Sequence, residues 1–317
     1  MILDPHTRII ALIEKFEPRL RRIFLLAVIK AKLSLGSLLR IEKLILSNNI
    51  MGALNRAILV NTKEIVEEQA LIYTTTGASG AKFLSNALKV TVNFDVVNER
   101  AVNAIKNNRL ELVRNFKEEQ KKAVKQALLS GAKRGLNPIE QAINFRDSIG
   151  LTAYQQQSVD NYRDLLERGN SQALDRRLRD RRFDTTIQNS IDSNIPLDYN
   201  QIDKMVKRYR ERYIKYRSEV IARTEALRGV NMGNEELYAQ AIEDGTINQK
   251  SLSRKWVATK DDRTRDSHAK LNGVIKKYGE IFQGLNGKLR FPGDPLAVAS
   301  ETIQCRCALA TRIKTLN

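Results

Sequence analysis

The 317-residue sequence has few of the residues that break helices or crosslink chains: six prolines, 16 glycines and two cysteines. Scarce proline and glycine argue against a fold built from many tight turns and favour long helices. The two cysteines, Cys305 and Cys307, are one residue apart, which excludes a disulfide framework because a bridge between them would be strained. We therefore expect the chain to be made in a reducing compartment.

The sequence also lacks a recognisable signal peptide and a membrane span. Its first residues, Met1–His6, are not a basic segment followed by an apolar run. The most apolar stretch, residues 23–39, is interrupted by Lys30 and Lys32, which favours a buried helix over a bilayer span. We therefore expect no membrane among the partners of the assembled protein.

Positively charged residues outnumber negatively charged ones in the sequence. The net charge is +18, from 54 Lys and Arg against 36 Asp and Glu. Such a field favours a polyanionic partner, either nucleic acid or an acidic protein surface, and a basic surface without a specific partner is the alternative. The hydrophobic content of 42% and the length are ample for a core, in two domains or one elongated chain.

Apolar side chains at helical spacing dominate the first 170 residues. They recur from Ile9 to Val28, where Pro18 is expected to end or kink the helix. Asn137 followed by proline predicts a later helix start. The small polar stretch Tyr73–Gly80 does not have the spacing of a phosphate-binding loop, so we expect a connector between helices there.

A basic region follows at residues 171–245, with a long helix expected after Asp198. Apolar side chains line one face of this helix, and basic side chains occupy the opposite face and its flanks: Lys204, Lys207, Arg208, Arg212 and Lys215. Residues 204–217 contain seven basic residues and one acid. That bias suits a helix facing phosphates or an acidic surface, and a solvated helix face is the alternative.

The residues with the most distinctive chemistry lie at the end, in residues 246–317. This stretch contains the only Trp, both cysteines and one of the two histidines. The pattern predicts a short strand anchored by Trp256, a short helix holding His268, several turns, and a final strand over Cys305–Leu309. The expected fold class is therefore mainly α: a helical N-terminal region (1–170), a basic helical region (171–245) and a small α+β C-terminal module (246–317).

Two chemical hypotheses assign this module a ligand or a reaction. In the first, Cys305, Cys307, His268 and one carboxylate hold tetrahedral zinc. A C-x-C pair on a regular strand would point to opposite faces, which argues against that site. In the second, Asp262, His268 and Asp294 form an acid–base group, or Cys305 and His268 a nucleophile pair.

A third hypothesis, which we favour, is a structural hydrogen-bonded unit. Three arginines would pair with three acids, His268 would complete the network, and both cysteines would be small buried hydrophobes. The arginines are Arg263, Arg265 and Arg306, and the acids are Asp262, Asp294 and Glu301. On the preceding helix, Arg223 is expected to pair with a carboxylate of the module, or to form a surface charge pair.

The order of these motifs resembles the C-terminal domain of the phage minor head protein family, also called the Mu F-like or head morphogenesis family. The resemblance covers residues 200–313 and rests on R-T-E at 223–225, K-W-V-A-T to L-N-G at 255–273, P-G-D-P at 292–295 and C-R-C at 305–307. The residues that carry it are Arg223, Glu225, Trp256, Asp262, Arg263, Arg265, His268, Asp294, Cys305, Arg306 and Cys307. The family usually has Asn before the first Cys, where this sequence has Gln304, so the local loop is expected to differ.

The resemblance implies a non-enzymatic structural protein of a tailed-phage virion, made in the host bacterial cytoplasm. It would lie in the head interior or portal region and act in head assembly and DNA packaging or delivery. Its partners would be the portal protein, the major capsid protein or a scaffold protein, with packaged double-stranded DNA nearby and no cofactor unless zinc is bound. Some relatives carry fused ADP-ribosyltransferase domains; the sequence ends at Asn317, soon after Cys307, so we expect none here.

Two other functions stay open. One is a DNA-binding or DNA-processing protein that uses the basic helix 198–217. The other is a metal-dependent enzyme centred on His268, Cys305 and Cys307.

Overall fold

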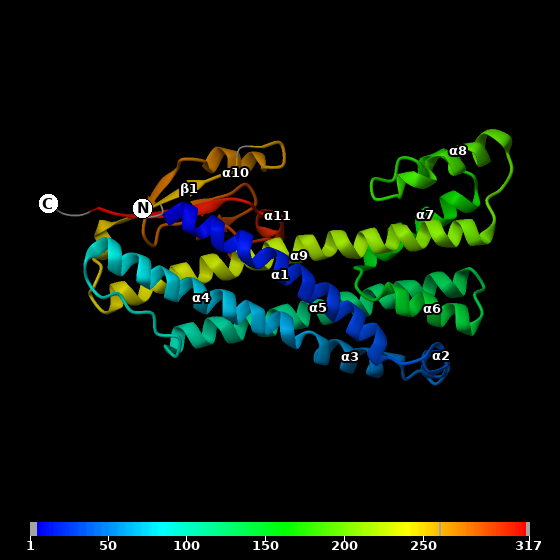
Figure 1. The fold of residues 1–317 in the computed structure, drawn as a ribbon, viewed down its shortest axis with the longest axis horizontal. Helices are drawn as coiled ribbons and strands as arrows, with labels where there is room; N and C mark the ends of the chain where they lie inside the picture. Colours follow the sequence, from blue (N-terminus) through cyan, green and yellow to red (C-terminus); the bar gives the residue numbers. More distant parts are fainter. Residues whose placement is uncertain (1–4, 260, 315–317) are drawn as a thin grey trace. The chain divides into compact units, whose positions relative to one another are not determined.

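The structure, a computed structural model, describes residues 5–259 and 261–314, and most of them are helical (Figure 1). The helices are α1 (Pro5–Ser34), α2 (Leu38–Leu46), α3 (Ile50–Asn61), α4 (Lys63–Leu88), α5 (Glu99–Lys133), α6 (Pro138–Ser148), α7 (Ala153–Glu167), α8 (Asp184–Ser193), α9 (Tyr199–Glu243), α10 (Asp266–Leu271) and α11 (Ala299–Thr302). The strands are β1 (Leu252–Val257), β2 (Ile275–Lys277), β3 (Phe282–Gln283), β4 (Lys288–Leu289) and β5 (Ala308–Ile313). The expected mainly α fold with a small C-terminal α+β module is confirmed.

Packing divides the chain into two units, each assembled from separated stretches of sequence. The first contains the described residues up to Phe24, Glu64–Leu112 and those from Glu219 onward. The second contains Leu25–Lys63 and Val113–Ser218. Helices α1, α5 and α9 each contribute one part to each unit. The units therefore cut across the predicted regions 1–170, 171–245 and 246–317, which describe the order of the sequence and stay predictions.

The main core of the first unit joins α1 and α9 to the C-terminal module (Figure 1). Helix α1 contributes Ile13 and Phe16, α9 contributes Val230, and the module contributes Trp256 and Leu309, all of them buried. Each large apolar side chain removed from water contributes roughly 1.5–3 kcal/mol. The small module is thus stabilised by sharing its core with two long helices.

Pro18, expected to end or kink α1, lies inside the helix, so the expected end is wrong. Proline removes one backbone donor and usually interrupts a helix. Here Pro18 is exposed, whereas Phe16 and Leu20 on either side of it are buried in the core. Packing of the apolar face therefore keeps the helix continuous past the proline.

The Tyr73–Gly80 stretch is also helical, so the predicted connector is wrong. Its polar side chains bond within the helix: the Thr76 hydroxyl donates to the Ile72 carbonyl at 2.8 Å. Its glycines leave room for neighbours, because a Cβ on Gly77 would come within 2.3 Å of the Phe94 ring. Helix α4 therefore packs closely against its neighbours along this stretch.

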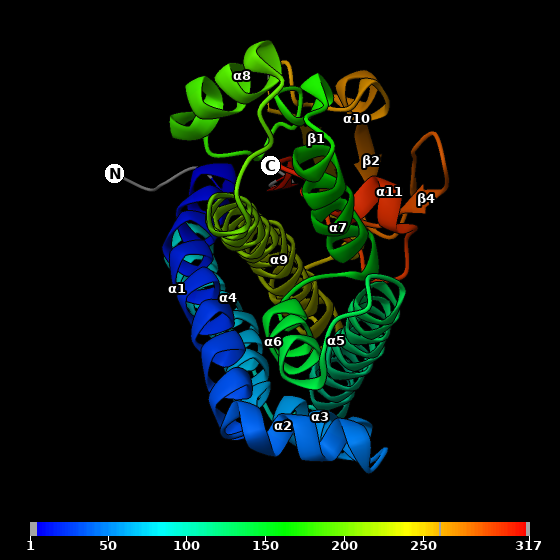
Figure 2. The same ribbon diagram turned by 90° about the vertical axis from the view of Figure 1, so that its right-hand side faces the viewer.

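Two cores form the second unit (Figure 2). One joins α2, α3 and α6 to the parts of α1 and α5 in this unit, with Ile41 and Phe145 fully buried. The other joins α7, α8 and the first half of α9, where the rings of Tyr162 and Tyr209 lie 4.3 Å apart. Tyr209 of α9 is therefore a core residue, as expected for an apolar stripe at helical spacing.

The helix starts predicted at Asn137 and Asp198 are confirmed by their hydrogen bonds. Asn137 and Thr152 each form a capping box, at α6 and α7 respectively. Before α9, the Asp198 carboxylate accepts from the Gln201 backbone amide at 2.9 Å. In turn, the Gln201 side-chain oxygen accepts from the Asp198 backbone amide at 3.1 Å. Such reciprocal bonds satisfy amides that have no partner in the first turn.

The C-terminal module has a three-stranded antiparallel sheet in the order β2-β1-β5. In the central strand, Leu252, Arg254 and Trp256 alternate onto the buried face, and Trp256 lies opposite Leu309 of β5. A separate pair, β3 and β4, sets Phe282 opposite Leu289. The expected strand at Trp256 and helix at His268 are confirmed.

We predict that Gly233→Ala destabilises the protein by about 1–3 kcal/mol, because overpacking costs that much. A Cβ on Gly233 in α9 would lie 2.4 Å from the Tyr73 carbonyl oxygen of α4. The matched control is Gly52→Ala in α3, where the new methyl meets only the Arg56 side chain at 3.8 Å. That change should stabilise by roughly 0.5–1 kcal/mol. Chemical unfolding followed by circular dichroism measures both, and equal effects would contradict the close contact.

Candidate functional site

His268, Cys305 and Cys307 converge in the interior of the C-terminal module. His268 lies on α10, and the cysteines lie between α11 and β5. The His268 Nδ1 atom is 3.4 Å from the Sγ atom of Cys305 and 3.4 Å from that of Cys307. The three side chains are 1–2% exposed, and their donor atoms all lie within 4.8 Å of one another. Two sulfur atoms and one ring nitrogen thus form one buried cluster.

The cysteines do not lie in the final strand, which corrects the expectation from sequence. Strand β5 begins at Ala308, so the rule that alternate strand residues face opposite ways does not apply to Cys305 and Cys307. Gln304 before them has a φ of +56°, in the left-handed region that suits Gly or Asn. Its amide donates to the Thr224 hydroxyl of α9 at 3.0 Å. This turn directs both sulfur atoms toward His268.

Glu301 holds the other side of the histidine ring. Its Oε2 atom lies 2.9 Å from His268 Nε2 and accepts from the Ser267 hydroxyl at 3.2 Å, while Oε1 accepts from the Asn286 amide at 2.8 Å. A Cβ on Gly284 would come within 3.1 Å of this carboxylate, so glycine makes room for it. Burial opposes ionisation, but the Asn286 amide and the histidine together lower the pKa of Glu301.

The two thiols differ in their ionisation because they share a hydrogen bond. That bond, joined by the histidine, lowers the pKa of Cys307 to about 5. The same bond and burial raise the pKa of Cys305 well above its ordinary value. Ionisation is therefore favoured at Cys307 over Cys305, and a thiolate is a stronger nucleophile and metal ligand than a thiol.

The outer polar layer uses partners other than those expected from sequence. Arg306 forms a double ion pair with Asp261, and Arg263 lies 3.8 Å from the same acid. Arg265 donates to the Ile303 carbonyl. Of the three expected acids, Glu301 bonds His268, and the Asp294 carboxylate lies 2.5 Å from the Arg290 guanidinium. The third, Asp262, is exposed.

The same geometry bears on the predicted acid–base group. The carboxylate beside His268 is that of Glu301, so the expected set of Asp262, His268 and Asp294 is not assembled. The expected pairing of Cys305 with His268 is present. Which acid meets the histidine depends on packing between α10 and α11, which residue spacing does not reveal.

In the R-T-E motif on α9, Arg223 and Glu225 face other helices, whereas Thr224 accepts from the Gln304 amide of the module. Arg223 pairs with Glu17 of α1 at 3.1 Å, so the expected partner in the C-terminal module is wrong. Glu225 pairs with Arg228 at 3.0 Å and accepts from the Gln69 amide of α4. The motif therefore ties α9 to its neighbouring helices in the first unit.

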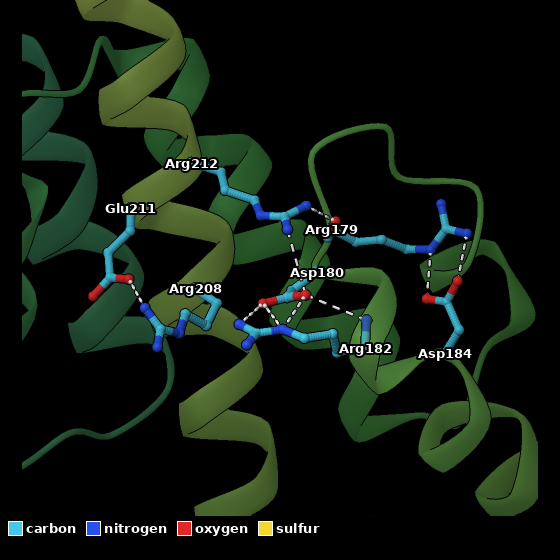
Figure 3. A network of polar contacts seen from close by, with 7 residues as sticks. All are labelled: Arg179, Asp180, Arg182, Asp184, Arg208, Glu211 and Arg212. Carbon is cyan, nitrogen blue, oxygen red and sulfur yellow. Dashed lines mark hydrogen bonds and ion pairs between the residues drawn. The ribbon is translucent and has the colours of Figure 1, made fainter.

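In the second unit, Asp180 organises the basic segment before α8 (Figure 3). It is 2% exposed and accepts from the Arg182 guanidinium, at 3.0 Å from Nε and 2.6 Å from Nη2, and from the Arg182 backbone amide at 3.2 Å. Arg212 of α9 approaches it at 3.4 Å. Nearby, Arg208 pairs with Glu211 at 2.8 Å. The Arg182 guanidinium is the main reason that the pKa of Asp180 falls to about 2.

The five predicted basic residues are all exposed, but their charges are not equally available. Arg208 and Arg212 have acidic partners, whereas Lys204, Lys207 and Lys215 form no ion pair within the described part of the chain. Two of the lysines line a surface hollow together with Arg182, Phe183, Arg208 and Glu211. This basic hollow could hold phosphate or carboxylate groups.

Two of the seven basic residues counted from sequence point inward instead. Arg210 bonds Asp147 of α6 at 3.3 Å, and Arg217 bonds Glu119 of α5 at 2.7 Å and the Gly150 carbonyl at 3.1 Å. They hold α9 to its neighbours within the second unit. The charge available to a partner is therefore smaller than the sequence count.

Residues 185–310 match the family described as Phage Mu protein F like protein. These residues form a Mu F-like domain. The match agrees with the motif resemblance over the same part of the sequence. The Mu F-like domain contains the basic half of α9 and every motif residue from Arg223 to Cys307.

The chain is also 36% identical over 87 residues to the NAD(+)--arginine ADP-ribosyltransferase EFV of Enterococcus faecalis (strain ATCC 700802 / V583). The match covers 27% of this chain and 17% of that enzyme, so the chain spans only a small part of it. No solved structure matches the chain. Among the described helices, none has a stretch both long and apolar enough to cross a bilayer.

One buried ion pair of the Mu F-like domain was not anticipated. Arg254 of β1 is 2% exposed and donates to both oxygens of Glu235 on α9 at 3.1 Å. It also donates to the carbonyls of Glu280 and Arg290, at 2.5 and 3.2 Å. The sequence contains a signal for this ion pair. Arg254 is a charged residue at an inward position of the predicted strand, between Leu252 and Trp256.

We predict that the contribution of Asp180 to stability is lost in acid. Its folded pKa of about 2 lies below an unfolded value of about 3.9, so its stabilisation is present above about pH 4 and disappears as the pH falls toward 2. Urea unfolding of the wild type and Asp180→Asn should differ at neutral pH and converge in acid. Arg182→Gln removes the main donor and should show the same pH window. If the difference in unfolding free energy between the wild type and Asp180→Asn stayed constant into acid, it would contradict the lowered pKa of Asp180.

Proposed function

We propose that this protein is a non-enzymatic minor head protein of a tailed phage, acting in head assembly and DNA packaging or delivery. The observation that carries the proposal is the Mu F-like domain at residues 185–310. Its motif residues form a folded centre: Trp256, His268 and both cysteines are buried in a core shared with α1 and α9. Such motif residues are needed for the fold itself.

Burial of the polar cluster supports a structural role over an enzymatic one. His268 has both ring nitrogens engaged, Nε2 with Glu301 and Nδ1 with the two sulfur atoms. Glu301 is 0% exposed and bonds three donors. A general acid–base pair must reach its substrate by a hydrogen bond or through one water, and this pair is enclosed.

Exposed aliphatic side chains support docking of the N-terminal helices on the portal, capsid or scaffold protein. They recur along the end of α1 and on α2 and α3, where a soluble surface would carry polar groups: Ile29, Leu33, Leu39, Leu46, Leu59 and Val60. Large exposed apolar surface is typical of protein interaction sites. A partner that covers these side chains would remove them from water.

We predict that the protein co-purifies with portal protein in procapsids and mature heads of the phage that encodes it. Heads purified by density gradient, with and without the gene, provide the comparison, and mass spectrometry provides the composition. Loss of the gene should lower the yield of infectious particles. Heads that never contain the protein, with normal infectivity after its deletion, would contradict the proposal.

A second candidate function, DNA contact, is favoured by the basic hollow on α9. We predict that the purified protein binds double-stranded DNA without sequence preference and that affinity falls steeply with salt. The triple variant Lys204→Glu, Lys207→Glu and Lys215→Glu should lose most of this binding, because these lysines lack ion-pair partners among the described residues. Fluorescence anisotropy with labelled DNA measures the effect.

The matched control reverses three exposed lysines of the C-terminal module, with the same change in net charge: Lys250→Glu, Lys277→Glu and Lys288→Glu. It should retain nearly all DNA affinity if the surface on α9 is the site. Equal loss in both triple variants would show that only net charge matters.

A further inference from the structure

We propose that His268 Nδ1 and the Sγ atoms of Cys305 and Cys307 bind one zinc ion. Imidazole nitrogen and thiolate sulfur are preferred zinc ligands, whereas calcium and magnesium prefer oxygen. The three donors come from α10 and from the segment between α11 and β5, and they meet in the module's interior. The site is independent of the proposed role in the phage head.

The distances among the donors fit zinc. With Zn–S of about 2.3 Å and Zn–N of about 2.0–2.1 Å, tetrahedral angles place nitrogen and sulfur about 3.6 Å apart. Both nitrogen–sulfur distances here are 3.4 Å. Each nitrogen–sulfur distance would therefore need to lengthen by only a few tenths of an ångström, and the two sulfur atoms lie within 4.8 Å of each other.

A hydrogen bond alone does not explain why two sulfur atoms approach the same nitrogen equally. When Nε2 donates to the Glu301 carboxylate, Nδ1 has a single lone pair, which can accept one S–H bond. The second sulfur atom lies at the same 3.4 Å but has no share in that lone pair. A metal ion on that lone pair contacts both sulfur atoms at once.

Glu301 supplies the support that zinc-binding histidines require. Such histidines usually donate their other ring N–H to a carboxylate or carbonyl, which fixes the tautomer and the ring orientation. Glu301 does this at 2.9 Å, and it is itself held by the Asn286 amide and the Ser267 hydroxyl. The imidazole is therefore fixed with Nδ1 directed at the sulfur atoms.

Charge balance also favours the divalent ion. Binding releases the thiol protons to solvent, and two thiolates then neutralise Zn²⁺, so the ion and its two cysteine ligands together carry no net charge. The described residues offer three donors, and we assign the fourth tetrahedral position to a water molecule. The ion would join α10 to the segment before β5 and so stabilise the module.

The direct test is the metal content of the full-length wild-type protein, purified without chelator after expression in zinc-supplemented medium. We expect one zinc per chain by plasma mass spectrometry. Replacement by Co²⁺ should give the thiolate-to-cobalt charge-transfer band and the visible bands of a tetrahedral site. Folded protein that contains no zinc and binds neither ion in titration would overturn the proposal, as would a Cys305–Cys307 disulfide in freshly purified protein.

Variants distinguish the cysteine ligands from Glu301, which orients the histidine ligand. Cys305→Ser and Cys307→Ser should each lose the stoichiometric zinc. Glu301→Gln should keep the ion but weaken zinc affinity by roughly 10–100-fold. The control is Asp261→Asn, which removes the Arg306 ion pair next to the site and should leave zinc affinity unchanged. If a cysteine variant fails to fold, the wild-type titration and Glu301→Gln still decide, because unchanged affinity in Glu301→Gln would contradict the geometry.

Discussion

The close contact between α4 and α9 is the constraint on which the first unit depends. A Cβ on Gly233 would lie 2.4 Å from the Tyr73 carbonyl oxygen, and one on Gly229 would lie 2.8 Å from the Ile72 side chain. Backbones can approach so closely only where side chains are absent. This contact leaves another side of α9 for the C-terminal module, where Asn231 donates to the Pro292 carbonyl at 2.8 Å.

The module needs α9 because its own strands are too short to bury a core. The polar contacts along α9 then determine where its loops lie: Thr224 holds the Gln304 amide, and Glu235 holds Arg254 of β1. The turn at Gln304 directs both cysteines inward, where His268 meets them. The chemistry of the buried cluster is therefore a consequence of how the module sits on the helix, within one packed unit.

Helix α9 uses its positive charge in two different ways. Arg210 and Arg217 are internal and bond Asp147 and Glu119, so they stabilise the second unit. Lys204 and Lys207 remain exposed in the hollow that they line with Arg182, and they retain their charge for a partner. A buried charge that lost its partner would be costly, whereas an exposed lysine can exchange water for a phosphate group. Only the second kind of residue fits a role beside packaged DNA.

The sequence by itself determined the mainly helical class, two of the helix caps and the class of the C-terminal module, because these depend on spacing and on neighbours a few residues away. The caps at Asn137 and Asp198 and the motif order that identifies the Mu F-like domain are of this kind. Only the tertiary structure decided that Pro18 is tolerated, that Asp261 and not Asp262 meets Arg306, and that two cysteines share one histidine nitrogen. Those outcomes depend on contacts between residues far apart in the chain, and local spacing contains no information about which surfaces pack together.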